Sequence, residues 1–161
     1  MLRDVPTIQE YYGVDPFLGG YDTQDAMSDE LKNFRQKEAN GTAERWANAV
    51  LYKLRHYDCK FRLYMGLSDA MSKHFRKESV DCLFIDGDHT YNGTKSDIQQ
   101  FIPLMKPNAL VVFDDYNFPG VKQALDEFVT LSGLQMTPVN RYNQYYVNMP
   151  AAGGSSVKLP V

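Results

Sequence analysis

Two short apolar runs in this chain each end in carboxylates. Residues 80–85 lead into Asp86, and residues 110–113 lead into Asp114 and Asp115. Such runs are typical of strands buried on both faces of a parallel sheet. Ligands bind beyond the carboxyl ends of these strands, so the three aspartates should converge on one crevice edge. A hard divalent cation would relieve their mutual repulsion. The alternative is that each aspartate caps the helix that follows it.

A histidine stands close to the first of these acids. His89 comes three residues after Asp86, so both side chains can face one pocket if a helix begins there. Histidine is well suited to take a proton near neutral pH. A metal held by the acids could lower the pKa of a substrate hydroxyl, and His89 would then remove its proton. The alternative is a histidine at a helix N-terminus that hydrogen-bonds the backbone.

An acid also follows an early β-prone run. The residues Tyr11, Tyr12, Gly13 and Val14 precede Asp15, which is followed by Pro16. A carboxylate at the end of an early strand can accept two hydrogen bonds from the ribose diol of a nucleotide-like cofactor. A turn aspartate before the proline explains the same pattern equally well.

The remaining pattern alternates strands with amphipathic helices. Strands are predicted to end at Asp15, Met65, Ile85 and Phe113, side by side in a largely parallel sheet. Helices are expected over residues 43–57, 70–75, 91–102 and 121–129. Two last β-prone runs, 134–139 and 144–147, are close enough to form an antiparallel pair. The prediction is a single α/β domain over residues 1–149 with a flexible tail over 150–161.

Composition excludes several classes of protein. The chain has 161 residues and a net charge of −3, with positive and negative side chains interspersed, so no basic stripe indicates a nucleic-acid partner. No apolar run approaches the ~20 residues that span a membrane, and the first ten residues lack the apolar core of a signal peptide. Cys59 and Cys82 are the only cysteines, and Cys82 falls in a predicted buried strand. A reducing, cytoplasmic environment is therefore expected.

The order of motifs resembles a known family. The chain carries in sequence YYGVDP, GLSDA, VDCLFIDGDHTY, LMKPNALVVFDDY and PGVKQALDEF. This series resembles class I S-adenosylmethionine-dependent methyltransferases, in the metal-dependent O-methyltransferase branch that includes macrocin O-methyltransferase. The resemblance covers roughly residues 11–147 and implies a Rossmann-like fold.

The resemblance also implies a role for each candidate residue. On the cofactor side, Asp15 would bind the ribose of S-adenosylmethionine, and Ser68 and Asp69 would lie beside the adenine. The metal site would hold Mg²⁺ or a similar cation, and its ligands would be Asp86, Asp114 and Asp115, with Asp86 also bordering the cofactor. His89 would be the general base that accepts the proton of a small-molecule hydroxyl substrate.

One family feature has no counterpart in this sequence. The first strand of the family and its glycine-rich loop, which approaches the methionine part of the cofactor, should precede Asp15 by some 20 residues. Only ten residues precede Tyr11, and they contain no glycine. We therefore expect an N-terminally incomplete or divergent methyltransferase-like domain that binds S-adenosylmethionine weakly or not at all and can self-associate through exposed strand edges.

Two other functions remain open at this point. Without its cofactor loop, the domain could be an inactive binding or scaffold module. In addition, Asp86, Asp88 and Thr90 fit the DxDxT pattern of Mg²⁺-dependent phosphatases, in which the first aspartate is the nucleophile and the second the general acid. That pattern usually lies on the first strand of its domain, whereas about 80 residues precede it here.

Overall fold

The chain folds into two compact units. The computed structural model describes residues 8–17, 44–45, 47–55, 60–139, 143–154 and 156–160. The N-terminal unit comprises residues 1–21 and 25–71, and the C-terminal unit comprises residues 22–24 and 72–161. Residues 18–41 lie outside the described residues, as does Trp46 of the first expected helix.

The N-terminal unit contains a pair of parallel strands. Strand β1 (Glu10–Asp15) pairs with β2 (Lys60–Met65), and Asp15 lies opposite Met65. Aromatic side chains line the pair: the rings of Tyr11 and Phe61, which face each other in register, stack with centroids 5.3 Å apart. Residues 44–45 and 47–54 are helical, and the short helix α2 (Ser68–Met71) follows β2.

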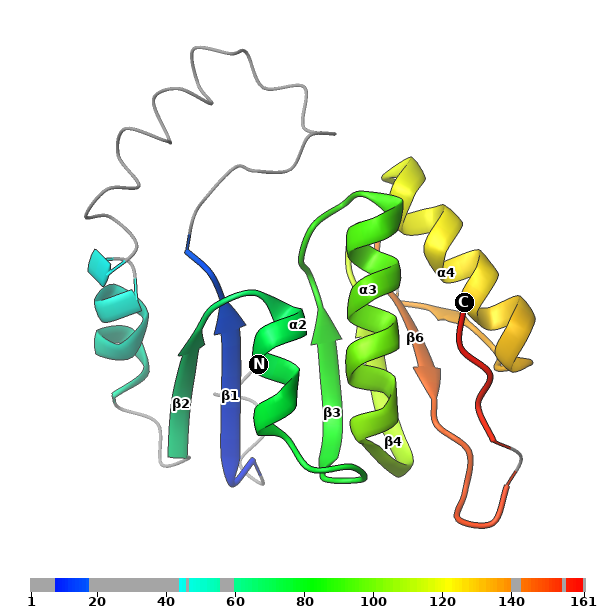
Figure 1. Cartoon of the computed structure of the whole chain (residues 1–161), viewed down its shortest axis with the longest axis horizontal. Coiled ribbons are helices and arrows are strands. Elements are labelled where there is room, and N and C mark those ends of the chain that lie inside the picture. The colour runs from blue at the N-terminus through cyan, green and yellow to red at the C-terminus, as the bar shows by residue number, and fades with distance from the viewer. Residues whose placement is uncertain are drawn as a thin grey trace. The chain divides into compact units, whose positions relative to one another are not determined.

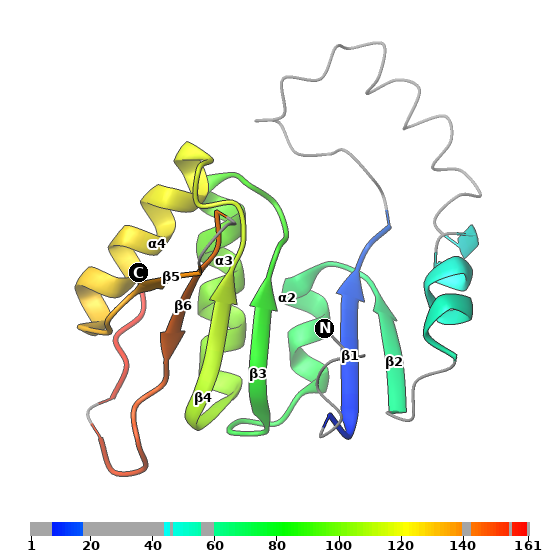
Figure 2. The same ribbon diagram turned by 180° about the vertical axis from the view of Figure 1, so that it is seen from behind.

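The C-terminal unit contains a four-stranded sheet in the order β3-β4-β6-β5. After a 3-10 turn, η1 (Ser72–His74), its elements are β3 (Val80–Ile85), α3 (Tyr91–Phe101), a second 3-10 turn, η2 (Ile102–Leu104), β4 (Met105–Phe113), α4 (Pro119–Ser132), β5 (Thr137–Pro138) and β6 (Tyr145–Asn148). Both views of the ribbon place α3 and α4 on the same face of this sheet (Figures 1 and 2).

The strand pairing confirms the predicted fold class. Strands β3 and β4 are adjacent and parallel, with Ile85 opposite Phe113, so their carboxyl ends meet at one edge. Strand β6 runs antiparallel to both β4 and β5, which is the expected antiparallel C-terminal pair. The four predicted parallel strands are hydrogen-bonded as two separate pairs rather than as one continuous sheet.

The core of the C-terminal unit lies between the sheet and its two helices. Val111 and Phe113 of β4 are fully buried, as are Ile98 of α3 and Leu125 and Phe128 of α4. The rings of Phe113 and Phe128 lie 6.1 Å apart, which fixes α4 against the centre of the sheet. The apolar stripe predicted for residues 121–129 therefore faces the core, as its 3.6-residue period requires.

Strand β4 begins earlier than the sequence suggested. The apolar run taken as this strand covers residues 110–113, yet β4 already starts at Met105. Val80 pairs with Met105 and Cys82 with Leu110, so three extra residues of β4 bulge out of register. Within this bulge Asn108 has a positive φ of 60° and donates from its backbone N–H to the Pro150 carbonyl, 3.0 Å away. A bulge tolerates proline because the regular ladder is already interrupted.

The expected burial of Cys82 was wrong. Cys82 is exposed and Phe84 is 38% exposed, because they lie on the face of β3 opposite the one that Leu83 and Ile85 turn toward the core. The tail expected to be flexible contains residues that pack onto the C-terminal unit: Val157 and Leu159 contact the core and Pro160 is fully buried. Gln99 of α3 donates a 2.7 Å hydrogen bond to the Pro160 carbonyl. Three apolar residues in the last five described positions are enough to cover core surface.

The helices of the described residues are all too short or too polar to cross a lipid bilayer.

Candidate active site

The loop after β3 holds two of the predicted site residues in a fixed turn. Asp86 is the first residue beyond the strand, and Thr90 caps α3 by accepting a 3.0 Å hydrogen bond from the Gly93 backbone N–H. Asp88 accepts from the backbone N–H of Thr90 at 2.9 Å and from its hydroxyl at 3.0 Å. His89 lies between these two capping residues, so its backbone position is set by the start of the helix.

The loop after β4 is bent at an aspartate. Asp115 has a φ of 55°, the left-handed conformation that residues with a side chain seldom adopt. Its backbone N–H donates to Asp114 Oδ1 at 2.8 Å, and its carbonyl accepts from the Phe118 N–H at 2.9 Å. This turn directs the Asp115 side chain toward the loop that follows β3.

His89 and Asp115 form the centre of the site. His89 Nε2 lies 3.0 Å from Asp115 Oδ2, and the two side chains are 20% and 33% exposed. The imidazole also stacks on the Phe118 ring, with centroids 4.3 Å apart. An oxygen of Asp86 completes a group in which the three ligand atoms lie within 4.8 Å of one another. Two carboxylates therefore face a ring that can exchange a proton.

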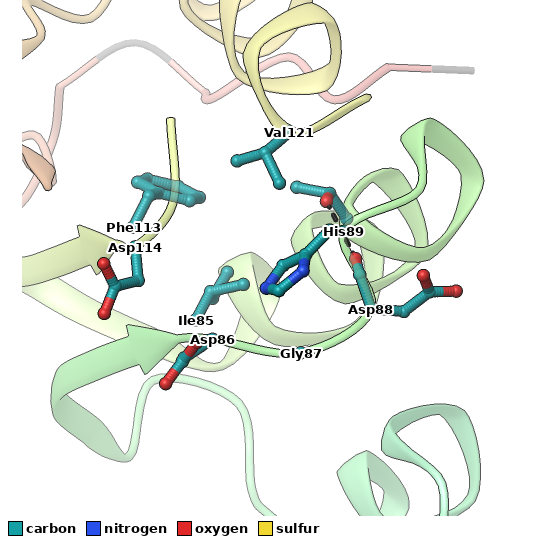
Figure 3. A pocket seen from close by; sticks show the side chains of 9 residues that line it. Ile85, Asp86, Gly87, Asp88, His89, Phe113, Asp114 and Val121 are labelled. Carbon is teal, nitrogen blue, oxygen red and sulfur yellow. Dashed lines mark hydrogen bonds between the residues drawn. The ribbon is translucent and has the colours of Figure 1, made fainter. Parts of the chain in front are cut away.

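A small pocket lies beside this group. Figure 3 shows Asp86 and His89 on the loop after β3, and Asp114 at the end of β4, around a pocket closed by Phe113 and Val121. The cavity volume of this pocket is about 10 Å³. That is room for about one water molecule or one ion.

The donor atoms of this group are suited to a divalent cation. Ligands on opposite sides of a six-coordinate ion are separated by about twice the metal–ligand distance, ~4–5 Å, which matches the spread of the Asp86, His89 and Asp115 atoms. The two carboxylates suit Mg²⁺ or Mn²⁺, which prefer oxygen ligands, whereas a set that included the imidazole nitrogen would suit Fe²⁺ or Zn²⁺. Of the three acids predicted as ligands, two are in this group.

The third predicted ligand, Asp114, is held elsewhere. Its Oδ1 accepts from the Asp115 backbone N–H, and its Oδ2 accepts from Gln144 Nε2 at 3.0 Å. Asp114 lines the pocket but is not a member of the compact donor group. In this arrangement it orients the turn that presents Asp115.

The predicted cofactor residues of the N-terminal unit also lie at strand ends. Asp15 ends β1, and its Oδ1 accepts a 2.6 Å hydrogen bond from the Phe17 N–H. Ser68 and Asp69 begin α2 directly after β2, and Asp69 Oδ1 accepts from the Ala70 N–H at 2.8 Å. The Gly66 N–H donates to the Asp15 carbonyl at 3.2 Å and ties the two strand ends together. These three residues therefore share one edge of the β1–β2 pair.

Several residues that shape the site carried no chemical signal in the sequence. Gly87 has Asp97 so close that an added Cβ would lie 2.7 Å from its Oδ2. Gly120, near the start of α4, lies so close to the loop that its Cβ would be 2.5 Å from the His89 carbonyl oxygen. At Gly87 the Asp97 carboxylate could shift, whereas the backbone atoms around Gly120 cannot move aside, and a sequence does not show which glycine has such a neighbour.

The phosphatase pattern does not match this geometry. In that mechanism the second aspartate of the motif must be available as a general acid. Here both oxygens of Asp88 accept hydrogen bonds from Thr90, so the residue stabilises the start of α3.

Comparison with known proteins assigns the family. Residues 1–116 match the model of the methyltransferase domain family, which is most of the chain, and the chain therefore belongs to this family. A search among curated proteins gave no match.

Solved structures share the fold at low identity. The chain is similar to the O-methyltransferase NovP (TM-score 0.57, 18% identity, covering 86% of this chain and 59% of that one). It is also similar to the O-methyltransferase TomG from Streptomyces achromogenes in complex with S-adenosylmethionine (TM-score 0.53, 12% identity, covering 94% of this chain and 77% of that one). A Corynebacterium glutamicum protein gives a TM-score of 0.56 at 11% identity and covers 90% and 62%. The chain thus spans about 60% of the first two structures compared with it.

Proposed function

We propose that this chain is the methyl-transferring part of an S-adenosylmethionine-dependent O-methyltransferase that uses a divalent cation. The observation that carries the proposal is the His89–Asp115 pair, 3.0 Å apart beside Asp86, at the carboxyl edge of β3 and β4. Membership of the methyltransferase domain family supports the reaction class. Within this family, we propose that the chain belongs to the metal-dependent branch that includes macrocin O-methyltransferase.

His89 is the proposed general base. The side chain is 20% exposed and lines the pocket, and its Nε2 lies 3.0 Å from Asp115 Oδ2, so the Asp115 carboxylate would stabilise the imidazolium formed when Nε2 accepts a proton. A base held in this way can take the proton of a substrate hydroxyl as the oxygen attacks a methyl group. The stacked Phe118 ring limits rotation of the imidazole, so the ring stays aimed at the pocket.

Asp86, Asp114 and Asp115 are the proposed cation ligands: oxygens of Asp86 and Asp115 belong to the compact donor group, and Asp114 lines the pocket beside it. The cation, when bound, would bring the substrate hydroxyl near His89 and increase its acidity, and S-adenosylmethionine would supply the methyl group. Asp15, Ser68 and Asp69 are the residues we propose for the ribose and adenine, because all three lie at strand ends in one unit.

The substrate class is a small molecule that carries a hydroxyl group. The pocket beside His89 has room for one small polar group, and Phe113 and Val121 form its apolar side. The substrate hydroxyl would therefore lie near His89 and the acids, and the apolar part of the substrate would lie near the N-terminus of α4. Sugars, phenols and alcohols of polyketide type all satisfy this requirement.

A base substitution tests the proposal. His89→Gln should lower turnover by about 10²–10⁴-fold, the usual effect of losing a general base, while S-adenosylmethionine affinity stays within about twofold. His74→Gln is the matched control, because His74 lies exposed in η1. Methyl transfer from labelled cofactor to a panel of hydroxyl compounds, with and without a chelator, gives the readout. Equal rates for wild type and His89→Gln would contradict the assignment.

Cofactor affinity separates this function from the scaffold alternative. A binding module that has lost the cofactor site would bind hydroxyl ligands or partners but show no calorimetric signal with S-adenosylmethionine. Asp15→Asn in the same titration should weaken binding if the ribose lies where we propose. Absence of cofactor binding by the wild-type chain would favour the scaffold function for the chain on its own.

A further inference from the structure

We propose that Tyr116 is a positioning residue that holds Asp115 against His89 by tying the loop after β4 to helix α4. The inference concerns the loop geometry itself, and its consequence for the cation rests on the proposed function. Tyr116 follows the two aspartates directly and was not among the residues singled out from the sequence. Its contacts on both sides of the loop distinguish it from an ordinary surface tyrosine.

The hydroxyl of Tyr116 is fixed by two charged residues of α4. It donates a hydrogen bond to Asp126 Oδ1 at 2.7 Å and accepts one from Lys122 Nζ, also at 2.7 Å. Lys122 Nζ in turn lies 2.6 Å from Asp126 Oδ2. Every member of this triangle contacts the other two, so the hydroxyl has one preferred position on the helix surface.

The rest of Tyr116 is held by the segment that leads into β6. Its ring packs on Tyr145, with centroids 4.3 Å apart. Its backbone N–H donates to the Asn143 carbonyl at 2.9 Å. The residue therefore links three parts of the C-terminal unit: the loop after β4, helix α4 and the start of β6.

The loop needs such a link because its conformation is unfavourable by itself. Asp115 has a φ of 55°, which an aspartate adopts at an energetic cost unless its surroundings impose it. The restraints next to it are the Asp114 side chain on the N-terminal side and Tyr116 on the other. If the Tyr116 hydroxyl is lost, the turn can relax toward an ordinary backbone conformation, which would carry Asp115 Oδ2 away from His89.

A similar set of residues in the same unit provides a matched control. Tyr91 also donates its hydroxyl to a carboxylate of α4, Glu127, and accepts from Lys95 Nζ at 3.2 Å. The hydrogen bonds of this second set join α3 to α4 and do not run to the turn at Asp115. Tyr91→Phe therefore removes the same kind of bond from the same helix without touching the loop.

The test compares Tyr116→Phe with Tyr91→Phe in the full chain. Amide hydrogen exchange at Asp115 and Phe118, followed by NMR, measures opening of the turn without any metal. Loss of one hydrogen bond of this kind should speed exchange about 5–10-fold in Tyr116→Phe and leave it unchanged in Tyr91→Phe. Lys122→Met, at a half-exposed position, should reproduce the effect in part. Equal exchange in wild type and Tyr116→Phe, or equal acceleration in both tyrosine variants, would overturn the inference.

Mn²⁺ titration separates this inference from the proposed function. If both hold, Tyr116→Phe should weaken Mn²⁺ binding about 5–10-fold and Tyr91→Phe should not. Undetectable Mn²⁺ binding by the wild-type chain would refute the metal site, while the exchange data would still decide the role of Tyr116. Faster exchange with unchanged Mn²⁺ affinity would refute the link between the turn and the cation.

Discussion

Gly120 is the position where a single added methyl group should disturb the site most directly. The Cβ of an alanine there would lie 2.5 Å from the His89 carbonyl oxygen and 2.5 Å from the Tyr91 nitrogen, whereas ordinary contacts begin at 3.4 Å. All the nearby atoms belong to backbone, so no side chain can rotate away. Relief requires a shift of about 0.9 Å between α4 and the turn that carries His89.

The cost of this overlap can be estimated from the behaviour of crowded cores. Overpacking by one methyl group costs about 1–3 kcal/mol, and the gain in helix propensity is small at the second residue of a helix. Gly120→Ala should therefore lower the free energy of unfolding by about 2 kcal/mol, which lowers Tm by roughly 4–8 °C for a chain of this size. A displacement approaching 1 Å at His89 should also reduce turnover by about 10–100-fold.

Gly133→Ala is the control for this prediction. Gly133 ends the same helix with a φ of 72°, and an added Cβ there meets nothing within 4 Å. Its cost should be about 1 kcal/mol from backbone conformation alone, with turnover unchanged. Thermal melting and the methyl transfer assay on both variants are sufficient. A Gly120→Ala variant with the Tm and turnover of wild type would refute the close packing of α4 on the His89 turn.

Two further variants test other parts of the C-terminal unit. Burial acts to raise the pKa of Asp126, but hydrogen bonds from Lys122 and Tyr116 outweigh it and leave the pKa lowered. The stability that this carboxylate contributes should be present above the ordinary aspartate pKa of about 4 and lost as the pH falls through the lowered value, so Asp126→Asn should flatten the acid limb of a plot of urea midpoint against pH. Deletion of residues 156–161 should lower the free energy of unfolding by about 1–3 kcal/mol because Pro160 is fully buried and Leu159 packs on the core. Lys158→Ala, at an exposed position, should leave the urea midpoint of the intact chain unchanged.

The ends of the strands could be predicted well because their signal is local. An aspartate or a glycine marks the end of each run, and the structure ends β1, β2, β3 and β4 at the expected residues. The start of β4 could not be predicted, since the chain passes through Pro107 in a bulge that depends on pairing with β3. The exposure of Cys82 depends likewise on which face of β3 the rest of the chain covers, and a continuous apolar run does not encode that choice.

The packing of the C-terminal segment does not follow from its composition. Residues 150–161 are rich in glycine, serine and alanine, a composition typical of disordered tails. Yet the last apolar residues fit against α3, and one long-range hydrogen bond from Gln99 fixes Pro160. Composition measures how much apolar surface a segment offers, but whether a core has a matching surface is decided by the rest of the fold.

The division of roles among the three acids follows from competition between side chains far apart in the sequence. Strand ends placed Asp86, Asp114 and Asp115 at one edge, and from that alone all three could be ligands. The structure adds Gln144, 30 residues beyond Asp114, whose amide occupies one oxygen of that carboxylate. The other oxygen of Asp114 accepts a hydrogen bond from the Asp115 N–H and so supports the left-handed turn that directs Asp115 toward His89. These hydrogen bonds leave lone pairs on both oxygens of Asp114, so the same carboxylate can support the Asp115 turn and stay a candidate cation ligand.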